Sequence, residues 1–313
     1  MVNILISGYY GFDNIGDESI LRTLVSSLRE HIPDCSLTVL SHNPTSTREK
    51  YGVEAVDRMS PMAILRAVKK CDMLISGGGS LLQDVTSSKS LHYYLSIIRC
   101  AEFFHKKVFI YSQGIGPIDR PGNRRATAAA LKRADGIVVR DERSASLLEE
   151  IGIARDKVVI TADPVIRMKK PDGDVGAEIL RKAGVSLDGR LTVGWAIRER
   201  DTDSRFVKEL LRSIQMMKDK YNAQSVLIPF HYEEDGEVCR HIAAQLPDDT
   251  AVCLNEKYLS EDMLSIIGNM DLLVGVRPHS LIYAAIMGVP LIGISYDPKC
   301  TAFLNSVGLD KLS

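Results

Sequence analysis

The sequence predicts an α/β fold of two doubly wound, Rossmann-like domains facing a cleft. Short apolar runs alternate with amphipathic stretches almost from end to end, which is typical of parallel strands joined by helical crossovers. A charged, glycine-bearing stretch at residues 167–190 interrupts this alternation. The 313 residues are enough for two domains that each bury a core.

We place the domains at residues 1–168 and 169–313. The first is expected to contain strands at 2–8, 36–41, 71–79, 107–116, 135–141 and 157–163. The second is expected to contain strands at 191–198, 225–231, 251–256, 270–277 and 290–297. A helix should follow the first strand, with a core-facing stripe of Ile20, Leu21, Leu24, Val25 and Leu28.

Composition excludes several classes of protein. The 39 Lys and Arg residues nearly balance the 40 Asp and Glu residues, so we expect no nucleic-acid partner. The six cysteines are not at metal-ligand spacing, and we interpret them as reduced thiols in a cytosolic protein that needs no metal. No apolar run reaches the roughly 18 residues that a membrane span requires.

The loop after the first strand is rich in glycine but lacks a nucleotide-binding signature. Its glycines, Gly8, Gly11 and Gly16, do not have Gly-x-Gly-x-x-Gly spacing. They fit either tight turns or contact with a ligand. Asn14 and Asp17 fit either helix caps or site residues. The triple glycine at 77–79 indicates a backbone that closely approaches a ligand or another part of the protein.

Four basic residues, Arg140, Arg277, His279 and Lys299, fall at or just after expected strand ends, where ligands bind in such sheets. Arg277 and His279 are two residues apart in a segment expected to be extended, so their side chains should point the same way. Arginine and lysine bind carboxylate or phosphate, and histidine can transfer a proton near neutral pH. The structural alternatives are surface salt bridges for Arg140 and Lys299 and a buried imidazole for His279.

Read in order, the motifs "GYYGFDNIGDESIL", "GGGSLLQD", "SQGIGP", "VVRDERS", "TADPV" and "GVRPHSLIYAAIMGVPLIGISYDPK" resemble the polysaccharide pyruvyl transferases. The likeness is greatest to the bacterial branch that modifies cell-wall polysaccharide for S-layer anchoring. It spans residues 3 to 300.

The resemblance implies a fold similar to that of the two-Rossmann (GT-B type) glycosyltransferases. Phosphoenolpyruvate would be the donor substrate, with no further cofactor. The product would be a pyruvate ketal on O4 and O6 of N-acetylmannosamine in a lipid-linked saccharide. A cytoplasmic enzyme would then contact the inner face of the cell membrane.

The resemblance also implies roles for particular residues. His279 would be the general acid and base, Arg277 and Arg140 would hold the donor's anionic groups, and Lys299 would assist. Pro278 departs from the aliphatic residue expected in the Arg-x-His pair and removes one N–H. Relatives are expected to continue beyond residue 313. The remaining candidates for substrate binding are Asn14, Asp17, Gly78, Gly79, Asp84 and Tyr10.

Two other functions stay open. A nucleotide-sugar glycosyltransferase would need a carboxylate for the ribose, which Glu256 or Asp271 could supply. A non-catalytic sugar- or anion-binding protein would tolerate loss of His279. Other side chains fit either function or structure: Tyr9 and Phe12 as sugar platforms, Trp195 and His231 in the cleft, and Arg124, Arg125, Lys132 and Arg133 as a lipid-binding or merely solvated helix face.

Overall fold

The computed structural model describes residues 1–85, 87–199, 202, 204–295 and 298–309. The chain forms two compact units. Unit 1 contains Met1–Phe12 and Asp17–Arg167, and unit 2 contains Asp13–Gly16 and Met168–Ser313. The sequence prediction places one division at residue 168 and does not anticipate that four residues of the first loop group with unit 2.

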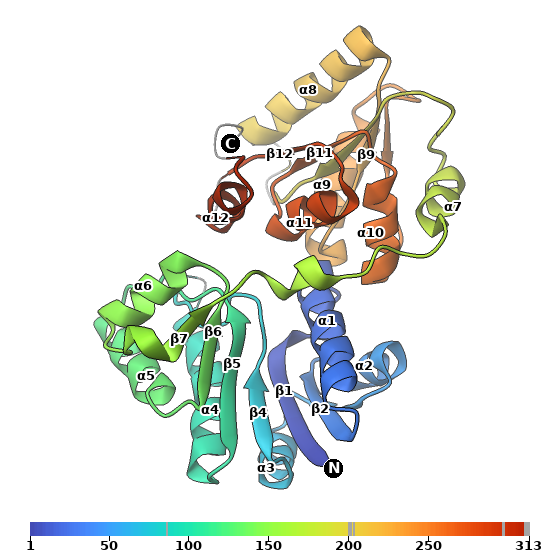
Figure 1. The fold of residues 1–313 in the computed structure, drawn as a ribbon. Coiled ribbons are helices and arrows are strands. Elements are labelled where there is room, and N and C mark those ends of the chain that lie inside the picture. The colour runs from blue at the N-terminus through green and yellow to red at the C-terminus, as the bar shows by residue number, and fades with distance from the viewer. Residues whose placement is uncertain (86, 200–201, 203, 296–297, 310–313) are drawn as a thin grey trace. The chain divides into compact units, whose positions relative to one another are not determined.

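Unit 1 is a parallel seven-stranded sheet in the order β3-β2-β1-β4-β5-β6-β7 (Figure 1). Its strands are β1 Val2–Tyr10, β2 Cys35–Ser41, β3 Glu54–Asp57, β4 Met73–Ser76, β5 Lys107–Gln113, β6 Gly136–Val139 and β7 Val158–Ile160. Its helices are α1 Ile15–His31, α2 Pro44–Tyr51, α3 Pro61–Lys70, α4 Ser88–Phe103, α5 Pro121–Leu131 and α6 Glu142–Glu150. The six strands expected in this part of the chain are confirmed. The sequence analysis missed β3, which has four residues, two of them acidic, at the sheet edge.

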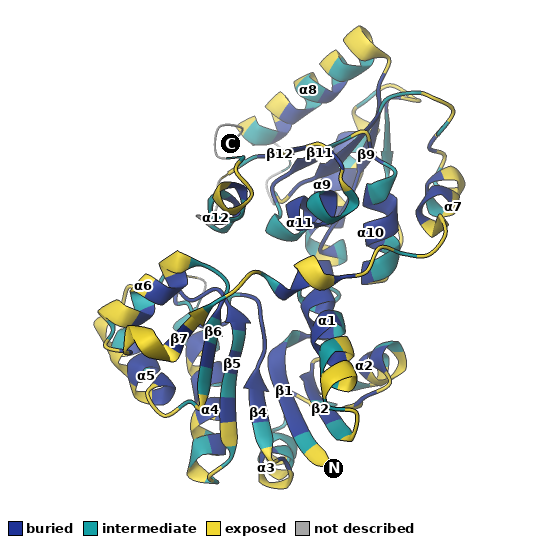
Figure 2. Cartoon of the chain, viewed as in Figure 1, coloured by how far each residue is buried: buried dark blue, intermediate teal, exposed yellow. Residues whose placement is uncertain are grey.

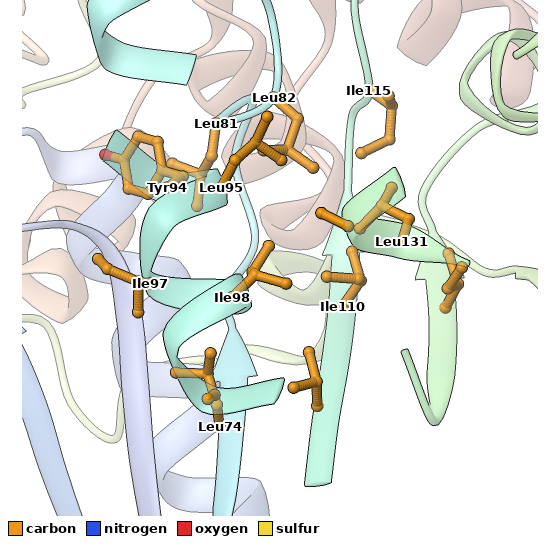
Figure 3. Close-up of a cluster of buried hydrophobic side chains, with 14 of the residues drawn as sticks. Leu74, Leu81, Leu82, Tyr94, Leu95, Ile97, Ile98, Ile110, Ile115 and Leu131 are labelled. Atoms are coloured by element: carbon orange, nitrogen blue, oxygen red, sulfur yellow. The ribbon is translucent and has the colours of Figure 1, made fainter. Parts of the chain in front are cut away.

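The core of unit 1 includes two clusters of buried side chains among the residues that the structure describes. One joins α4 to β4 and β5 through residues such as Leu95, Ile98, Leu74 and Ile110 (Figure 3). The other packs α1 against β1 and β2. Four members of the predicted α1 stripe are buried, and Leu28 packs against them, so the helical period was read correctly.

Unit 2 is a parallel five-stranded sheet in the order β10-β9-β8-β11-β12. Its strands are β8 Thr192–Ala196, β9 Gln224–Leu227, β10 Ala251–Cys253, β11 Leu272–Gly275 and β12 Leu291–Gly293. Its helices are α7 Val175–Lys182, α8 Arg205–Tyr221, α9 Tyr232–Ala244, α10 Ser260–Gly268, α11 Pro278–Met287 and α12 Pro298–Ser306. All five expected strands are present, although positions 296–297 of the last lie outside the described residues. Figure 2 shows the buried strands between more exposed helices.

Each sheet has a point at which the strand order reverses. In unit 1 this switch point lies between β1 and β4, and in unit 2 it lies between β8 and β11. Crossover connections diverge there, which leaves a crevice beyond the carboxyl ends of the two strands. The loops after β1 and β4 and the loop after β11 are therefore where ligand-binding residues should lie.

Candidate active site

The triple glycine follows β4 at the switch point of unit 1 and is required by packing. A Cβ atom on Gly77 would lie 2.1 Å from Tyr10 Oη, and one on Gly78 would lie 2.8 Å from Ile20 Cγ2. Gly79 has φ +87°, and a Cβ there would lie 2.9 Å from Asp17 Oδ1. Neighbouring side chains within unit 1 thus account for all three glycines, because they leave no space for a side chain.

Tyr10 is 0% exposed and belongs to the core on the α1 side of the sheet. Its ring therefore offers no face to a sugar, which speaks against the predicted role in substrate binding. Burial raises the pKa of the phenol well above its usual value, and the nearby Asp17 carboxylate adds to that shift. No described residue hydrogen-bonds its hydroxyl.

Asp84 also has a structural explanation. Its carboxylate accepts hydrogen bonds from the backbone N–H groups of Asp119 and Arg120, at 2.9 and 3.0 Å, and from Asn123 Nδ2 at 2.8 Å. Burial alone would raise its pKa, but these three hydrogen bonds outweigh burial and lower it. Asp84 holds the start of α5.

Arg140 follows β6 and is paired inside unit 1. Its Nη1 lies 2.9 Å from Asp163 Oδ2, and its Nη2 donates to Ser80 Oγ at 3.1 Å. The two ionic side chains are only 9% and 10% exposed. A Cβ on Gly114 would lie 2.8 Å from Arg140 Nε, so that glycine makes room for the guanidinium.

The segment Asp13–Gly16 is held by residues of unit 2. Ile15 N donates to Phe230 O at 3.0 Å, and Asp13 pairs with Lys257 at 2.8 Å. The hydrogen bond to Asp13 raises the pKa of Lys257. Asn14 accepts from Gly16 N at 3.0 Å, so its interpretation as the N-cap of α1 is confirmed.

Gly16 contacts the imidazole of His279. A Cβ atom on this glycine would lie 2.1 Å from His279 Nδ1, closer than any two such atoms approach. Gly16 does not have a positive φ, so the close approach of the histidine ring explains the glycine. Gly16 is therefore explained by its contact with His279, a predicted site residue, and not by a tight turn.

Arg277 and His279 lie at the switch point of unit 2, but not in an extended segment. β11 ends at Gly275, Arg277 is the N-cap residue of α11, and His279 lies in its first turn. Pro278 is the first helical residue, where the missing N–H costs nothing because it would have no partner within the helix. The first turn is the positive end of the helix dipole, which favours an anionic ligand.

Arg277 is fixed by a buried carboxylate that the sequence analysis did not identify. Its Nε donates to Asp235 Oδ2 at 3.1 Å, and its Nη2 bonds Asp235 Oδ1. Asp235 is 1% exposed and also accepts from His231 N at 2.9 Å. The Arg277 side chain is 12% exposed, and Glu234 lies 3.9 Å from its Nη2. The pair fixes the orientation of the guanidinium at the N-cap of α11.

Other candidates have clear positions. Lys299 is half-buried in the first turn of α12, which follows β12. Trp195 is buried in the core and donates to Ser225 Oγ at 2.9 Å. His231 caps α9 and accepts from Glu234 N at 3.2 Å.

Asp271 lies immediately before β11 and accepts from Thr192 N at 2.8 Å. It is therefore at the amino edge of the sheet, opposite the edge where ligands bind.

Comparison with known proteins agrees with the strand-end motifs. Residues 14–298 match the model of the family described as polysaccharide pyruvyl transferase. The chain belongs to this family. It is also 21% identical to the amylovoran biosynthesis protein AmsJ of Erwinia amylovora, in an alignment covering all of this chain and 88% of AmsJ. The protein is therefore a transferase of polysaccharide biosynthesis.

Solved structures establish the fold type. HepE of Anabaena, in complex with UDP-glucose, is 11% identical over 94% of this chain and 80% of its own, with a TM-score of 0.63. The UDP-GlcNAc 2-epimerase of Methanocaldococcus jannaschii is 14% identical over 98% and 86%, with a TM-score of 0.65. ADP-heptose LPS heptosyltransferase II of E. coli is 14% identical over 97% and 88%, with a TM-score of 0.54. These likenesses confirm the predicted two-Rossmann, GT-B-like fold.

A metal-binding cluster and a membrane-spanning helix are both absent from the described residues. No group of three or more His, Cys, Asp or Glu side chains is arranged to hold a metal ion within the ranges that the structure describes. No helix in those ranges is long and apolar enough to cross a membrane.

Proposed function

We propose that this protein transfers the pyruvyl group of phosphoenolpyruvate to two hydroxyls of one sugar as a ketal and releases phosphate. The proposed acceptor is N-acetylmannosamine, linked through O4 and O6, in a lipid-linked precursor of a secondary cell-wall polysaccharide of the S-layer anchoring type. Membership of the pyruvyl transferase family and the strand-end motifs support this proposal.

The observation that carries the proposal is the position of Arg277 and His279 at the start of α11, at the switch point of unit 2. Phosphoenolpyruvate is small and carries both a carboxylate and a phosphate. Three features suit such an anion: the guanidinium of Arg277, which Asp235 holds in place, the first turn of α11, and Lys299 in α12. His279 adds a group that can donate and accept a proton.

The chemistry follows in two steps. His279 gives its proton to the methylene carbon of phosphoenolpyruvate while the oxygen of the first sugar hydroxyl bonds to the central carbon, and the imidazole then takes up the proton that this hydroxyl loses. The carbon–oxygen bond to phosphate then breaks, and the second hydroxyl closes the ketal as its proton leaves with phosphate. Arg277 and Lys299 stabilise the charge on the departing phosphate.

Arg140 remains in the proposal as a catalytic residue of unit 1. Because Asp163 and Ser80 already accept from its two Nη atoms, an anion would have to share or displace these partners. Arg140→Lys keeps the charge and loses the planar fork, so a loss of activity in this variant would support a role that depends on arginine geometry.

The glycosyltransferase alternative is weakened by the position of Asp271 at the amino edge of its strand. Glu256 is the remaining carboxylate proposed for a ribose. In the binding-protein alternative, loss of His279 would leave ligand affinity unchanged.

The first experiment measures phosphate release from phosphoenolpyruvate with a synthetic N-acetylmannosaminyl lipid-linked acceptor, without added metal. We expect release that requires the acceptor and adds one pyruvyl mass to it. His279→Ala should lower the rate by about 10²- to 10⁴-fold, the range for a lost general acid. His241→Ala, on α9 of the same unit, is the matched control and should retain activity.

Two results would contradict the proposal. Absence of phosphoenolpyruvate turnover together with stabilisation of the protein by uridine nucleotides would favour the glycosyltransferase. Tight phosphoenolpyruvate binding that is unchanged in His279→Ala, without turnover by either protein, would favour a binding protein.

A further inference from the structure

Helix α3 of unit 1 presents basic and apolar side chains on the same exposed surface. Met62, Arg66 and Lys69 are all exposed and lie at i, i+4 and i+7, so they share one side of the helix. Val68 is buried on the other side. The surface begins with two exposed methionines, Met59 at 68% and Met62 at 59% exposure. We name the set Met59, Met62, Arg66, Lys69 and Lys70 the α3 surface.

The α3 surface carries charge of one sign. The helix contains three basic residues and no acidic residue. The flanking acids are already engaged, because Asp57 accepts from Met59 N at 2.8 Å and Asp72 accepts from Asn3 N at 2.8 Å. Neither of these acids forms an ion pair with Arg66, Lys69 or Lys70.

A further exposed apolar side chain extends the surface at the carboxyl end of α3. Lys69 Nζ lies 5.1 Å from the ring centroid of Phe104, and that ring packs edge-on against Phe103 at 5.1 Å. Phe103 is 75% exposed. Large apolar side chains thus lie at both ends of a basic helix.

The basic cluster predicted from the sequence on α5 lacks this combination. Arg124 donates to Ile118 O at 2.7 Å and pairs with Glu150 at 3.4 Å, so it is engaged within unit 1. The exposed positions of that region, such as Arg125, Lys132 and Arg133, have no large exposed apolar side chain among them. Charge without apolar anchors is typical of a solvated surface.

We propose that the α3 surface binds the anionic face of a lipid bilayer. A helix with cations and exposed methionines can lie in the interface, with the apolar groups among the acyl chains and the cations at the headgroups. Met59 follows the carboxyl end of β3, and α3 then runs to the amino edge of the parallel sheet, where β4 begins. The surface therefore extends along the side of the sheet from one edge to the other. The proposal rests on the proposed lipid-linked acceptor.

The test is flotation of the full chain with phosphatidylcholine vesicles, with or without about one third phosphatidylglycerol. We expect binding only to the anionic vesicles and its loss at high salt. Arg66→Gln/Lys69→Gln/Lys70→Gln should weaken partitioning about a hundredfold, since each cation near an anionic surface contributes about fivefold. Met59→Ser/Met62→Ser should weaken it about tenfold.

The matched control is Arg125→Gln/Lys132→Gln/Arg133→Gln, which removes the same charge from the α5 region. Its partitioning should stay within about twofold of wild type. An equal loss in the control would overturn the proposal, as would wild-type binding by the α3 variants or no vesicle binding by wild type. A change in sedimentation of the α3 variants, without a change in vesicle binding, would instead identify the surface as a contact between protein chains.

Turnover of a water-soluble N-acetylmannosaminide separates this proposal from the proposed function. All α3 variants should process that acceptor at the wild-type rate, because their site is unchanged. Loss of vesicle binding with normal turnover supports the α3 surface, while absence of turnover in wild type counts against the function and leaves the flotation result to be judged by itself.

Discussion

The two switch points of this protein carry different kinds of residue. In unit 1, the loop after β4 is three glycines packed under Tyr10, Ile20 and Asp17. In unit 2, Arg277 and His279 lie at the start of α11, just after β11, and Gly16, from the segment Asp13–Gly16, lies against the imidazole. Small residues allow close packing at one switch point, whereas ionisable groups occupy the other.

An arginine–aspartate pair lies near each switch point, Arg140–Asp163 in unit 1 and Arg277–Asp235 in unit 2. The two pairs differ in the other groups that contact the arginine. Arg140 also donates to Ser80 and lies 3.7 Å from Asp141. Arg277 depends mainly on Asp235, which is almost wholly buried. We infer that the pair in unit 2 is more sensitive to loss of its acid. The predictions below test this contrast, beginning with the largest expected effect.

Removal of the aspartate from an arginine–aspartate pair should reduce stability most in unit 2. Asp235→Leu leaves the guanidinium of Arg277 mostly buried without its acid, so we expect unfolding free energy to fall by about 3–5 kcal/mol. Trp195, the single tryptophan, lies in the unit 2 core, so its fluorescence in urea reports on this unit. Arg277→Met/Asp235→Leu should recover most of the loss of stability but no activity.

The corresponding change in unit 1 is the control. Asp163→Leu should cost less, because Arg140 keeps Ser80 and has Asp141 nearby. Equal losses from the two single changes would contradict the contrast between the pairs.

The contact between Gly16 and His279 should affect activity more than stability. In Gly16→Ala the new methyl group must displace the imidazole, so we expect turnover to fall by about 10²-fold. Gly122→Ala is a matched control, since Gly122 is also the second residue of its helix and a Cβ there would meet nothing within 4 Å. It should raise stability by about 0.5–1 kcal/mol and leave turnover unchanged.

Normal turnover of Gly16→Ala with an intact fold would mean that the position of the His279 ring is unimportant. The general-acid assignment would then have to be withdrawn.

The residues that could be predicted from the sequence are those whose signal is local. Apolar periodicity placed eleven strands and the α1 stripe, and glycine clusters and basic residues after strands marked the switch-point loops. β3 was missed because Glu54–Asp57 is short and partly acidic. Pro278 replaces the aliphatic residue expected in the Arg-x-His pair and removes one N–H, but its place as the first residue of α11 follows the usual preference of helix starts for proline.

Features that depend on tertiary contacts could not be predicted. Asp235 lies in "YEEDGE", an acidic run typical of an exposed helix start, and only the fold brings it to Arg277, 42 positions away. The sequence likewise offered Tyr10 as a candidate for substrate binding, yet alternation along β1 directs this ring into the core. Gly16 could have been recognised only from the position of His279.

The glycines of unit 1 should be needed for stability. In Gly79→Ala the positive φ and the close contact with Asp17 Oδ1 should together cost about 2–3 kcal/mol. Gly184→Ala has φ +90° and nothing within 4 Å, so it measures the cost of backbone conformation alone, about 1–2 kcal/mol. Urea unfolding followed by far-UV circular dichroism gives both values. Equal costs would show that packing against Asp17 does not require this glycine.

The smallest effect concerns Asp84 and separates a structural from a binding role at the unit 1 switch point. Because its folded pKa is lowered, the ionised carboxylate stabilises the fold above its unfolded pKa of about 3.9, and this stability is lost as the pH falls through the folded value. Asp84→Asn should therefore lower the melting temperature near neutral pH, by an amount equivalent to about 1 kcal/mol, and the difference from wild type should shrink in acid. The structural role also predicts normal turnover at a temperature where the variant is folded. A variant with the wild-type melting curve but a raised KM for phosphoenolpyruvate or acceptor would instead restore Asp84 as a substrate-binding residue, and the two switch points would then differ less than their packing suggests.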